Sequence, residues 1–205
     1  SFEYGECYVN PADVALLYEH GDIDKRYGFV MGGGKPEGAF VPKKEDVVPP
    51  CAVKTLPVQD GDVFDLGGVQ IEAIAVPGHT AGTMVYLDRA RRVLYSGDAC
   101  NANTLLGLPC STTVETYAKS LDHLATYLKG IDKFYGGHGL QAVPAYIVDE
   151  AMILCEEILS DDDDRFETEF LGRKFLYARK FDGMFHREDG GIANIAYVME
   201  KVYNK

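Results

Sequence analysis

The sequence predicts a mixed α/β (α+β) fold, and three of its features indicate this class. Residues 53–98 carry short apolar runs separated by Gly-rich or charged turns, which is typical of antiparallel strands. Two segments with a helical apolar stripe follow, at 112–128 and 144–158. Residues 165–205 return to strand-like runs with Gly-rich turns. With 205 residues, the chain can bury a core without needing a disulfide or a structural metal merely to fold.

The first fifty residues are predicted to begin with a strand and a helix. Residues 6–10 have strand character, and Pro11 suits the first position of a helix whose apolar spacing continues over 12–18. Residues 21–50 show no strong period and are interpreted as an insertion or a mobile loop. Within them, Gly34–Lys35 lacks both the first Gly and the Ser or Thr of a phosphate-binding P-loop, so we interpret it as a plain loop.

Two strand pairs are predicted next. The apolar runs 63–66 and 69–73 flank a Gly67–Gly68 turn, which tolerates positive φ and indicates a hairpin. A second pair, 84–87 and 93–95, surrounds a charged turn.

Two helices follow the strands. Thr112 and Glu115 fit a capping box, and one apolar face continues to Leu128. Pro144 is predicted to open the second helix, whose apolar positions continue to Ile158.

The last part of the chain is predicted to be a β-rich extension. Strand-like runs cover 174–178 and 195–199. The run Asp161–Asp164 lacks the alternating ligands, the Gly and the terminal Glu of a calcium loop, and is interpreted as a solvated loop. We therefore divide the chain into a main domain, 1–160, and an extension, 161–205, packed on the same domain.

Charge and cysteine content limit the partners and the compartment. Lys and Arg number 20 against 32 Asp and Glu, a net charge of −12, which argues against nucleic acid or an anionic membrane as partner. No apolar run approaches the ~20 residues of a membrane-spanning helix. The odd number of cysteines without CxxC spacing predicts buried free thiols and a cytoplasmic location. The cysteines are Cys7, Cys51, Cys100, Cys110 and Cys155.

Three polar residues stand at the ends of predicted strands. His79 follows an apolar run and lies between Gly78 and Gly82, which allow a sharp turn. Asp98 ends the next strand pair, and His138 follows a third strand. Open α/β sheets place their sites at such strand ends, and two imidazoles with a carboxylate suit zinc, iron or manganese. Each residue alone also has a plainer explanation, as a turn former, a helix cap or a surface histidine.

Five motifs in series resemble the metallo-β-lactamase superfamily, above all its glyoxalase II-like and general hydrolase branches. The resemblance covers about residues 5–160. The motifs are Asp60-Gly61-Asp62, Leu66-Gly67-Gly68, Pro77-Gly78-His79-Thr80-Ala81-Gly82, Ser96-Gly97-Asp98 and Gly137-His138-Gly139. The resemblance implies a four-layer α-β-β-α sandwich. It also implies that His79, Asp98 and His138 are metal ligands, with Asp98 bridging two metals and helping to fix the attacking hydroxide.

The signature His-x-His-x-Asp-His of this family is absent from these residues. Two explanations stay open: the chain is truncated, or it is a natural relative that lost the motif. Truncation is favoured because the sequence begins at Ser1 without Met and because the strand at 6–10 resembles the one that follows the motif in this family. The expected domain is thus N-terminally incomplete. The remaining histidines are isolated in the sequence. We expect His123 to be solvent-exposed, whereas His186 lies in the extension, whose loops can cover a site.

The resemblance implies a metal-dependent hydrolase of an ester, thioester, lactone or related carbonyl compound, acting through a metal-bound hydroxide. With three candidate ligands, this chain is expected to be impaired. The alternative is a metal-free, non-catalytic interaction module. We expect a small-molecule substrate and a zinc, iron or manganese cofactor, which this chain either lacks or binds at partial occupancy. We also expect a homo-oligomer, most simply a homodimer. Asn101 and Asn103 are interpreted as turn formers rather than substrate ligands.

Overall fold

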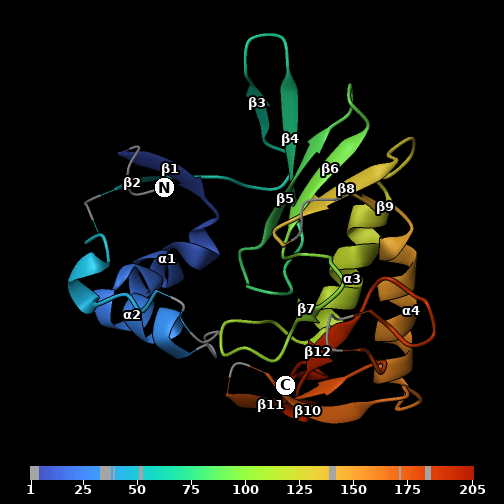
Figure 1. The fold of residues 1–205 in the computed structure, drawn as a ribbon. Coiled ribbons are helices and arrows are strands. Elements are labelled where there is room, and N and C mark those ends of the chain that lie inside the picture. The colour runs from blue at the N-terminus through green and yellow to red at the C-terminus, as the bar shows by residue number, and fades with distance from the viewer. Residues whose placement is uncertain are drawn as a thin grey trace.

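The computed structural model describes residues 5–32, 38, 40–50, 53–138, 142–170, 172–182 and 186–205. They form α-helices and three sheets (Figure 1). The strands are β1 Glu6–Val9, β2 Lys54–Pro57, β3 Val63–Asp65, β4 Gln70–Ala75, β5 Met84–Asp88, β6 Val93–Gly97, β7 Thr104–Leu105, β8 Lys133–Gly136, β9 Val143–Pro144, β10 Phe166–Phe170, β11 Arg173–Tyr177 and β12 Ile195–Tyr197. The α-helices are α1 Val14–Gly21, α2 Ile23–Gly32, α3 Val114–Ala125 and α4 Ile147–Leu159, and the 3-10 helices are η1 Pro11–Asp13, η2 Lys44–Asp46 and η3 Met199–Lys201.

The largest sheet has the strand order β3-β4-β5-β6-β8-β9. Both predicted strand pairs are confirmed as antiparallel pairs, β3 with β4 and β5 with β6, whereas β6 pairs with β8 in parallel. One face of the sheet packs on α3 and α4, where Leu87, Leu94 and Phe134 are buried. In Figure 1, α3 and α4 lie below the right-hand part of this sheet, and β1 and β2 with α1 and α2 lie to its left.

The opposite face of this sheet is aromatic. Tyr86 pairs with Tyr95 and Tyr95 with Tyr135 across neighbouring strands, so the three side chains share one face. The Tyr95 and Tyr135 rings stack with their centroids 6.1 Å apart. Phe64 extends the row towards β1, where Tyr8 meets its ring edge-on at 4.8 Å. The period-2 alternation therefore separates a buried aliphatic face from a partly exposed aromatic one.

Both predicted helices form, but each begins later than predicted. The N-cap of α3 is Thr113, whose hydroxyl accepts a hydrogen bond from the Thr116 amide, and not Thr112. Glu115 instead pairs with Lys119. Pro144 does not open α4, because it lies in the edge strand β9, where its missing N–H costs no ladder bond.

The interpretation of residues 21–50 as irregular was wrong in part. Residues Ile23–Gly32 form α2, and Lys44–Asp46 form η2. The side chain of Asp22 accepts a hydrogen bond from the Lys25 amide at the start of α2, as an N-cap does. A helix with an interior glycine, Gly28, has a weak apolar period, which is why the pattern did not reveal it. Gly34–Lys35 lies outside the described residues.

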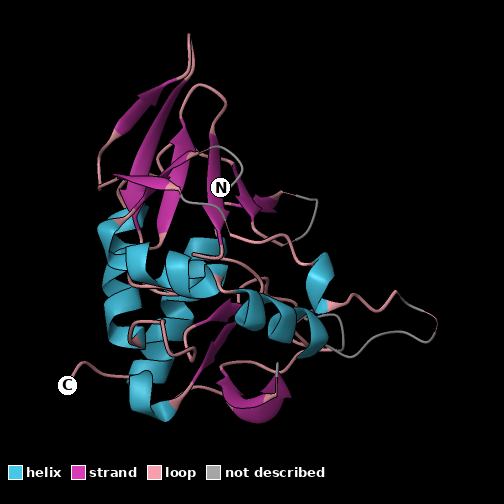
Figure 2. Ribbon diagram, turned by 90° about the vertical axis from the view of Figure 1, so that its left-hand side faces the viewer, coloured by secondary structure: helices cyan, strands magenta, loops and turns pink. Residues whose placement is uncertain are grey.

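A four-stranded sheet, β10-β11-β12-β7, joins the end of the chain to its middle. Strand β12 pairs in parallel with β7, so that Ile195 lies opposite Thr104 and Ala196 opposite Leu105. Neither β7 nor β10 was predicted. In Figure 2 the six-stranded sheet occupies the top, helices lie in the middle, and strands of this second sheet lie below. Ile195 belongs to the same core cluster as the buried residues of α3 and α4.

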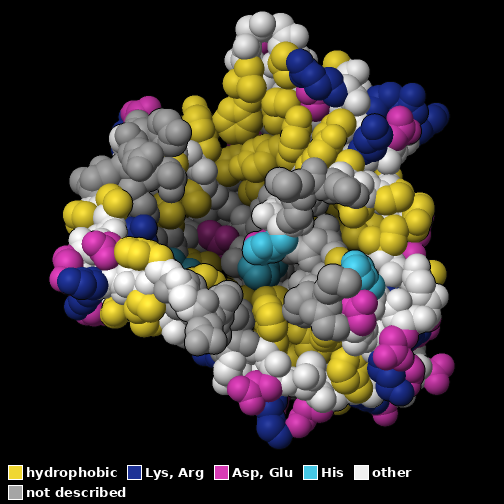
Figure 3. Space-filling view, in the orientation of Figure 1, with side chains coloured by type: hydrophobic (Ala, Val, Ile, Leu, Met, Phe, Trp, Pro, Cys, Tyr) yellow, Lys and Arg dark blue, Asp and Glu magenta, His cyan; other side chains and the backbone are white. Residues whose placement is uncertain are grey.

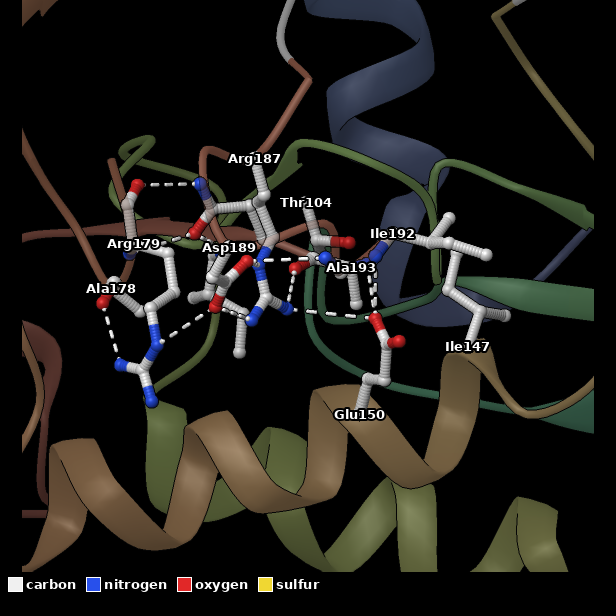
Figure 4. Close-up of polar contacts among 12 residues, drawn as sticks. Thr104, Ile147, Glu150, Ala178, Arg179, Arg187, Asp189, Ile192 and Ala193 are labelled. Atoms are coloured by element: carbon white, nitrogen blue, oxygen red, sulfur yellow. Dashed lines mark hydrogen bonds and ion pairs between the residues drawn. The ribbon is translucent and has the colours of Figure 1, made fainter. Parts of the chain in front are cut away.

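An ionic cluster fastens the loop before β12 to α4 (Figure 4). Glu150 of α4 accepts hydrogen bonds from the amides of Ile192 at 2.6 Å and Ala193 at 2.9 Å. Arg187 donates to the Ala193 carbonyl at 2.7 Å and pairs with Asp189. A carboxylate that accepts two backbone donors fixes the loop geometry more firmly than a surface ion pair does.

Among the described residues, no helix combines the length and the apolar composition needed to cross a bilayer.

Candidate metal site

His79 lies in the loop between β4 and β5. Its Nδ1 lies 3.1 Å from the carbonyl oxygen of Leu105, which follows Thr104 in β7. Because a carbonyl only accepts hydrogen bonds, Nδ1 carries the proton, and in the neutral imidazole Nε2 then carries the lone pair. Histidine ligands in metal sites are commonly oriented by such a bond from the second ring nitrogen, so this contact is compatible with ligation through Nε2.

Asp13, at the end of η1, holds this loop in place. Its Oδ1 accepts a hydrogen bond from the Gly82 amide at 2.9 Å, and its Oδ2 accepts one from the Thr80 hydroxyl at 2.5 Å. A side chain at Gly82 would collide with this carboxylate, since a Cβ there would lie 2.6 Å from the Asp13 Cγ. Sequence reasoning missed Asp13, because no local pattern links it to a loop 67 residues away.

Asp98 and His138 meet where the parallel strands β6 and β8 end. Gly97 lies opposite Gly136 in the register of these strands, and the two side chains that follow come together with His138 Nε2 3.2 Å from Asp98 Oδ1. The Asp98 side chain is 36% exposed and that of His138 is 82% exposed, so both remain accessible from solvent.

The loop after Asp98 is built by asparagine side chains. The Asn101 side chain accepts a hydrogen bond from the Asn103 amide at 2.7 Å, which forms an Asx turn. The side-chain nitrogen Nδ2 of Asn101 lies 3.4 Å from Asp98 Oδ1, so Asn101 also contacts the candidate ligand.

The structure brings two of the three predicted residues together. Asp98 and His138 are in contact, whereas His79 is held separately by Leu105. Within the part of the chain that the structure describes, no three His, Cys, Asp or Glu side chains gather closely enough to hold a metal ion. In Figure 3, histidine and acidic side chains lie near the hollowed centre of the face, below the apolar surface of the large sheet.

The remaining histidines were also placed by the structure. His123 is 41% exposed and pairs with Asp60 at 3.1 Å, so it is less exposed than expected because it bridges α3 to the β2–β3 loop. His186 lies 3.2 Å from Asp182, and His20 is exposed at the end of α1.

The buried cysteines are chemically inert. Burial raises the pKa of the Cys100 thiol to about 12 and also raises the pKa of Cys155, so both stay protonated at neutral pH. These two confirm the prediction of buried free thiols, whereas Cys7 and Cys110 are free but only half-buried, and Cys51 lies outside the described residues.

Gly137 leaves room for the Asp98 carboxylate. A Cβ at Gly137 would lie 2.7 Å from Asp98 Oδ1, whereas one at Gly136 would meet its nearest atom at 3.5 Å. We expect Gly137→Ala to displace the carboxylate and to weaken metal binding by about 10-fold or more, as changes beside metal ligands do. Isothermal titration of the purified chain with zinc measures this, and Gly136→Ala is the matched control. Equal affinities for the two variants would contradict the expectation.

A family model described as "Metallo-beta-lactamase superfamily" matches residues 8–165. The acyl-coenzyme A thioesterase MBLAC2 of Homo sapiens is 31% identical over 86 residues, which cover 41% of this chain and 31% of the relative. A hydroxyacylglutathione hydrolase of Mesorhizobium japonicum is 38% identical over 120 residues, 57% of this chain and 41% of the relative. The chain thus matches less than half the length of these relatives.

Solved structures show the same fold. A metallo-β-lactamase family protein of Thermus thermophilus superposes with a TM-score of 0.51 at 22% identity, over 76% of this chain and 54% of that one. A sec-alkylsulfatase of a Pseudomonas species superposes with a TM-score of 0.56 at 11% identity, over 78% of this chain and 29% of that one. These identities are low, so the structures inform on the fold alone.

Proposed function

Because this chain belongs to the metallo-β-lactamase superfamily and has its α+β fold, we propose that it is a metal-dependent hydrolase of an ester, thioester, lactone or related carbonyl compound. The observation that carries the proposal is the contact between Asp98 and His138 at the ends of neighbouring parallel strands. The names of the relatives support the substrate class, since they refer to hydrolysis of acyl-coenzyme A and of hydroxyacylglutathione. Acyl thioesters are therefore the first substrates to examine.

The donor set fits a divalent cation. Two imidazoles and one carboxylate suit zinc, iron or manganese, and the Nδ1 bond of His79 leaves Nε2 as its ligating atom. Bound there, such a cation would acidify a water molecule and polarise the substrate carbonyl. Asp98 and His138 would hold it from the strand ends and His79 from the neighbouring loop. The carboxylate of Asp98 would accept a hydrogen bond from the attacking water and so direct it.

The chain is proposed to be impaired as it stands. The 205 residues contain no His-x-His-x-Asp-His, and the three donors do not form a closed group among the described residues. A site with few ligands and an open geometry binds metal weakly. We therefore expect low affinity and slow turnover.

Metal titration combined with a hydrolysis assay tests the proposal. The purified chain is freed of metal with a chelator and titrated with zinc, iron(II) or manganese, and cleavage of acyl-coenzyme A, hydroxyacylglutathione, a simple ester and a lactone is followed. We expect about one weakly bound equivalent and a hydrolysis rate that rises with metal occupancy. Failure to bind any of the three metals, or hydrolysis that the chelator leaves unchanged, would overturn it.

A second candidate, favoured by the aromatic sheet face, is a metal-free interaction module that forms a homo-oligomer. Tyr95 and Tyr135 are 43% and 40% exposed and continue the row that includes Phe64 and Tyr86. Figure 3 shows apolar side chains gathered over this sheet. Adjoining exposed aromatic rings are typical of protein interfaces. We propose that the partner is a second copy of the chain. We also propose a reducing, cytoplasmic location, which the free cysteines support.

Self-association through this face makes a testable prediction. We expect Tyr95→Lys to weaken dimer formation by at least about 10-fold, because a central aromatic anchor would be lost. Two copies of a chain with a net charge of −12 repel each other, and an added lysine reduces this repulsion. Weaker association of Tyr95→Lys would therefore be due to the loss of the aromatic ring. Ile153→Lys, at another exposed apolar position on α4, is the matched control. Sedimentation velocity at several concentrations measures the change, and a monomeric unmodified chain would contradict the candidate.

A further inference from the structure

We propose that Lys201, in the C-terminal 3-10 helix η3, is a positioning residue for His79 that acts through the segment 105–111. The inference rests on the proposed function, because it concerns a candidate ligand of the metal. Lys201 lies outside the residues that the family model matches, 8–165. The family pattern therefore does not point to it, and the contacts alone carry the argument.

The first step is the contact between His79 and the segment 105–111. The Leu105 carbonyl accepts the Nδ1 hydrogen bond that sets the ring orientation. The Ser111 hydroxyl lies 2.9 Å from the His79 carbonyl and 3.2 Å from the Leu105 carbonyl, and it can donate to either. The orientation of the ring and the position of the His79 backbone therefore both depend on where this segment lies.

The beginning of the segment is held by β12. The Thr104 amide donates to the Asn194 carbonyl at 2.9 Å, and the Leu106 amide donates to the Ala196 carbonyl at 2.7 Å. These two bonds flank Leu105, so its carbonyl oxygen is directed towards His79. The four-stranded sheet thus holds the backbone on both sides of this acceptor, while the Ser111 hydroxyl contacts the carbonyl oxygen itself.

The end of the segment is held by the Lys201 ammonium. Its Nζ donates to the carbonyls of Leu108 at 2.6 Å, Pro109 at 3.1 Å and Ser111 at 2.5 Å. An ammonium has three N–H donors, so these carbonyls match its full capacity. Three carbonyl oxygens turned towards one point repel each other when no cation lies between them. Lys201 consequently stabilises the turn that brings the Ser111 hydroxyl to His79.

Close packing restrains the middle of the segment, so Lys201 matters most for its outer part. A Cβ at Gly107 would lie 2.7 Å from the Phe175 ring and 3.1 Å from Val198, so the backbone there lies against the C-terminal sheet. Loss of the ammonium is therefore expected to release the outer part, 108–111, and with it the Ser111 hydroxyl, which lies 3.2 Å from the Leu105 carbonyl that accepts the His79 Nδ1 bond. The predicted consequence is a His79 ring that is no longer held in one tautomer and one orientation.

The test uses the metal-free chain first. Long-range ¹H–¹⁵N NMR of the neutral His79 imidazole reports which nitrogen carries the proton, and we expect Nδ1–H in the unmodified chain. In Lys201→Met we expect a mixture of the two tautomers and a zinc affinity lowered about 10- to 100-fold, the range for groups that orient a metal ligand. Lys201→Arg, which keeps the charge and the donors, should fall closer to the unmodified chain in both measurements. Lys174→Met is the matched control, because Lys174 pairs with Glu167 on the same C-terminal sheet.

The outcomes separate this inference from the proposed function. If the unmodified chain binds no metal, the proposed function fails, but the tautomer comparison still decides the role of Lys201. If Lys201→Met keeps the Nδ1–H tautomer, or if Lys174→Met has the same effect, the positioning role is overturned. Should circular dichroism show that Lys201→Met does not fold, Ser111→Ala replaces it, since it removes the hydroxyl that contacts the carbonyls of His79 and Leu105. An unchanged tautomer and zinc affinity in Ser111→Ala would then overturn the inference, and a mixed tautomer would support it.

Discussion

Replacement of Asp98 by alanine is expected to lower the affinity of the chain for zinc by more than about 100-fold. Groups that only orient metal ligands already account for 10- to 100-fold, and a direct ligand contributes more. Asp98 is also the only carboxylate among the three proposed ligands, so its loss removes the negative charge that offsets the cation. Competition with a chromophoric chelator measures the affinity.

Asp60→Ala is the matched control for this variant. Asp60 forms a second Asp–His pair, with His123 at 3.1 Å, whose residues lie outside the candidate site. We expect zinc affinity to be unchanged in Asp60→Ala. An Asp98→Ala variant that binds zinc within threefold of the unmodified chain would contradict the assignment of Asp98 as a ligand.

Replacement of Phe134 by alanine is expected to lower the free energy of unfolding by about 3–5 kcal/mol, the usual cost of emptying a large buried aromatic site. Phe134 is fully buried between the large sheet and its helices. The next residue, Tyr135, points to the opposite face and is 40% exposed. Urea denaturation followed by circular dichroism, at concentrations below any self-association, measures both changes.

Tyr135→Ala is the control for this prediction, and we expect it to cost about 1 kcal/mol or less, because it loses one partly exposed stacking contact. Similar losses for the two variants would mean that the alternation of faces in β8 is not as described.

Much of the fold follows from periodicity in the sequence. The two strand pairs and the apolar faces of α3 and α4 were predicted because each repeats a pattern over several residues. Helix starts were less predictable, since Thr112 and Thr113 are chemically equivalent caps and only the backbone decides between them. Strand β7 has two residues and carries no period of its own, so its pairing with β12 could not be predicted.

The sequence predicts three candidate ligands but not how they are arranged. His79, Asp98 and His138 each follow a predicted strand, and the parallel pairing of β6 and β8 brings the last two together. The partners of His79 could not be found from sequence, because Leu105 contributes a backbone carbonyl, and a backbone atom carries no residue-type signal. Lys201 could not be found for the same reason, because it also contacts backbone carbonyls. The Leu108 and Ser111 carbonyls that it contacts lie 90 or more residues away in the sequence.

The pairing of β12 with β7 has a consequence for the order of folding. Hairpins close quickly because their contacts are local, whereas contacts between distant parts of a chain form later at a larger cost in loop entropy. The Asp98–His138 contact must wait for the connection through α3, and the Lys201 contacts with Leu108 span 93 residues. We therefore expect competence to bind metal to appear only at the end of folding. A chain emerging from the ribosome would complete the large sheet before Lys201 can reach the segment 105–111.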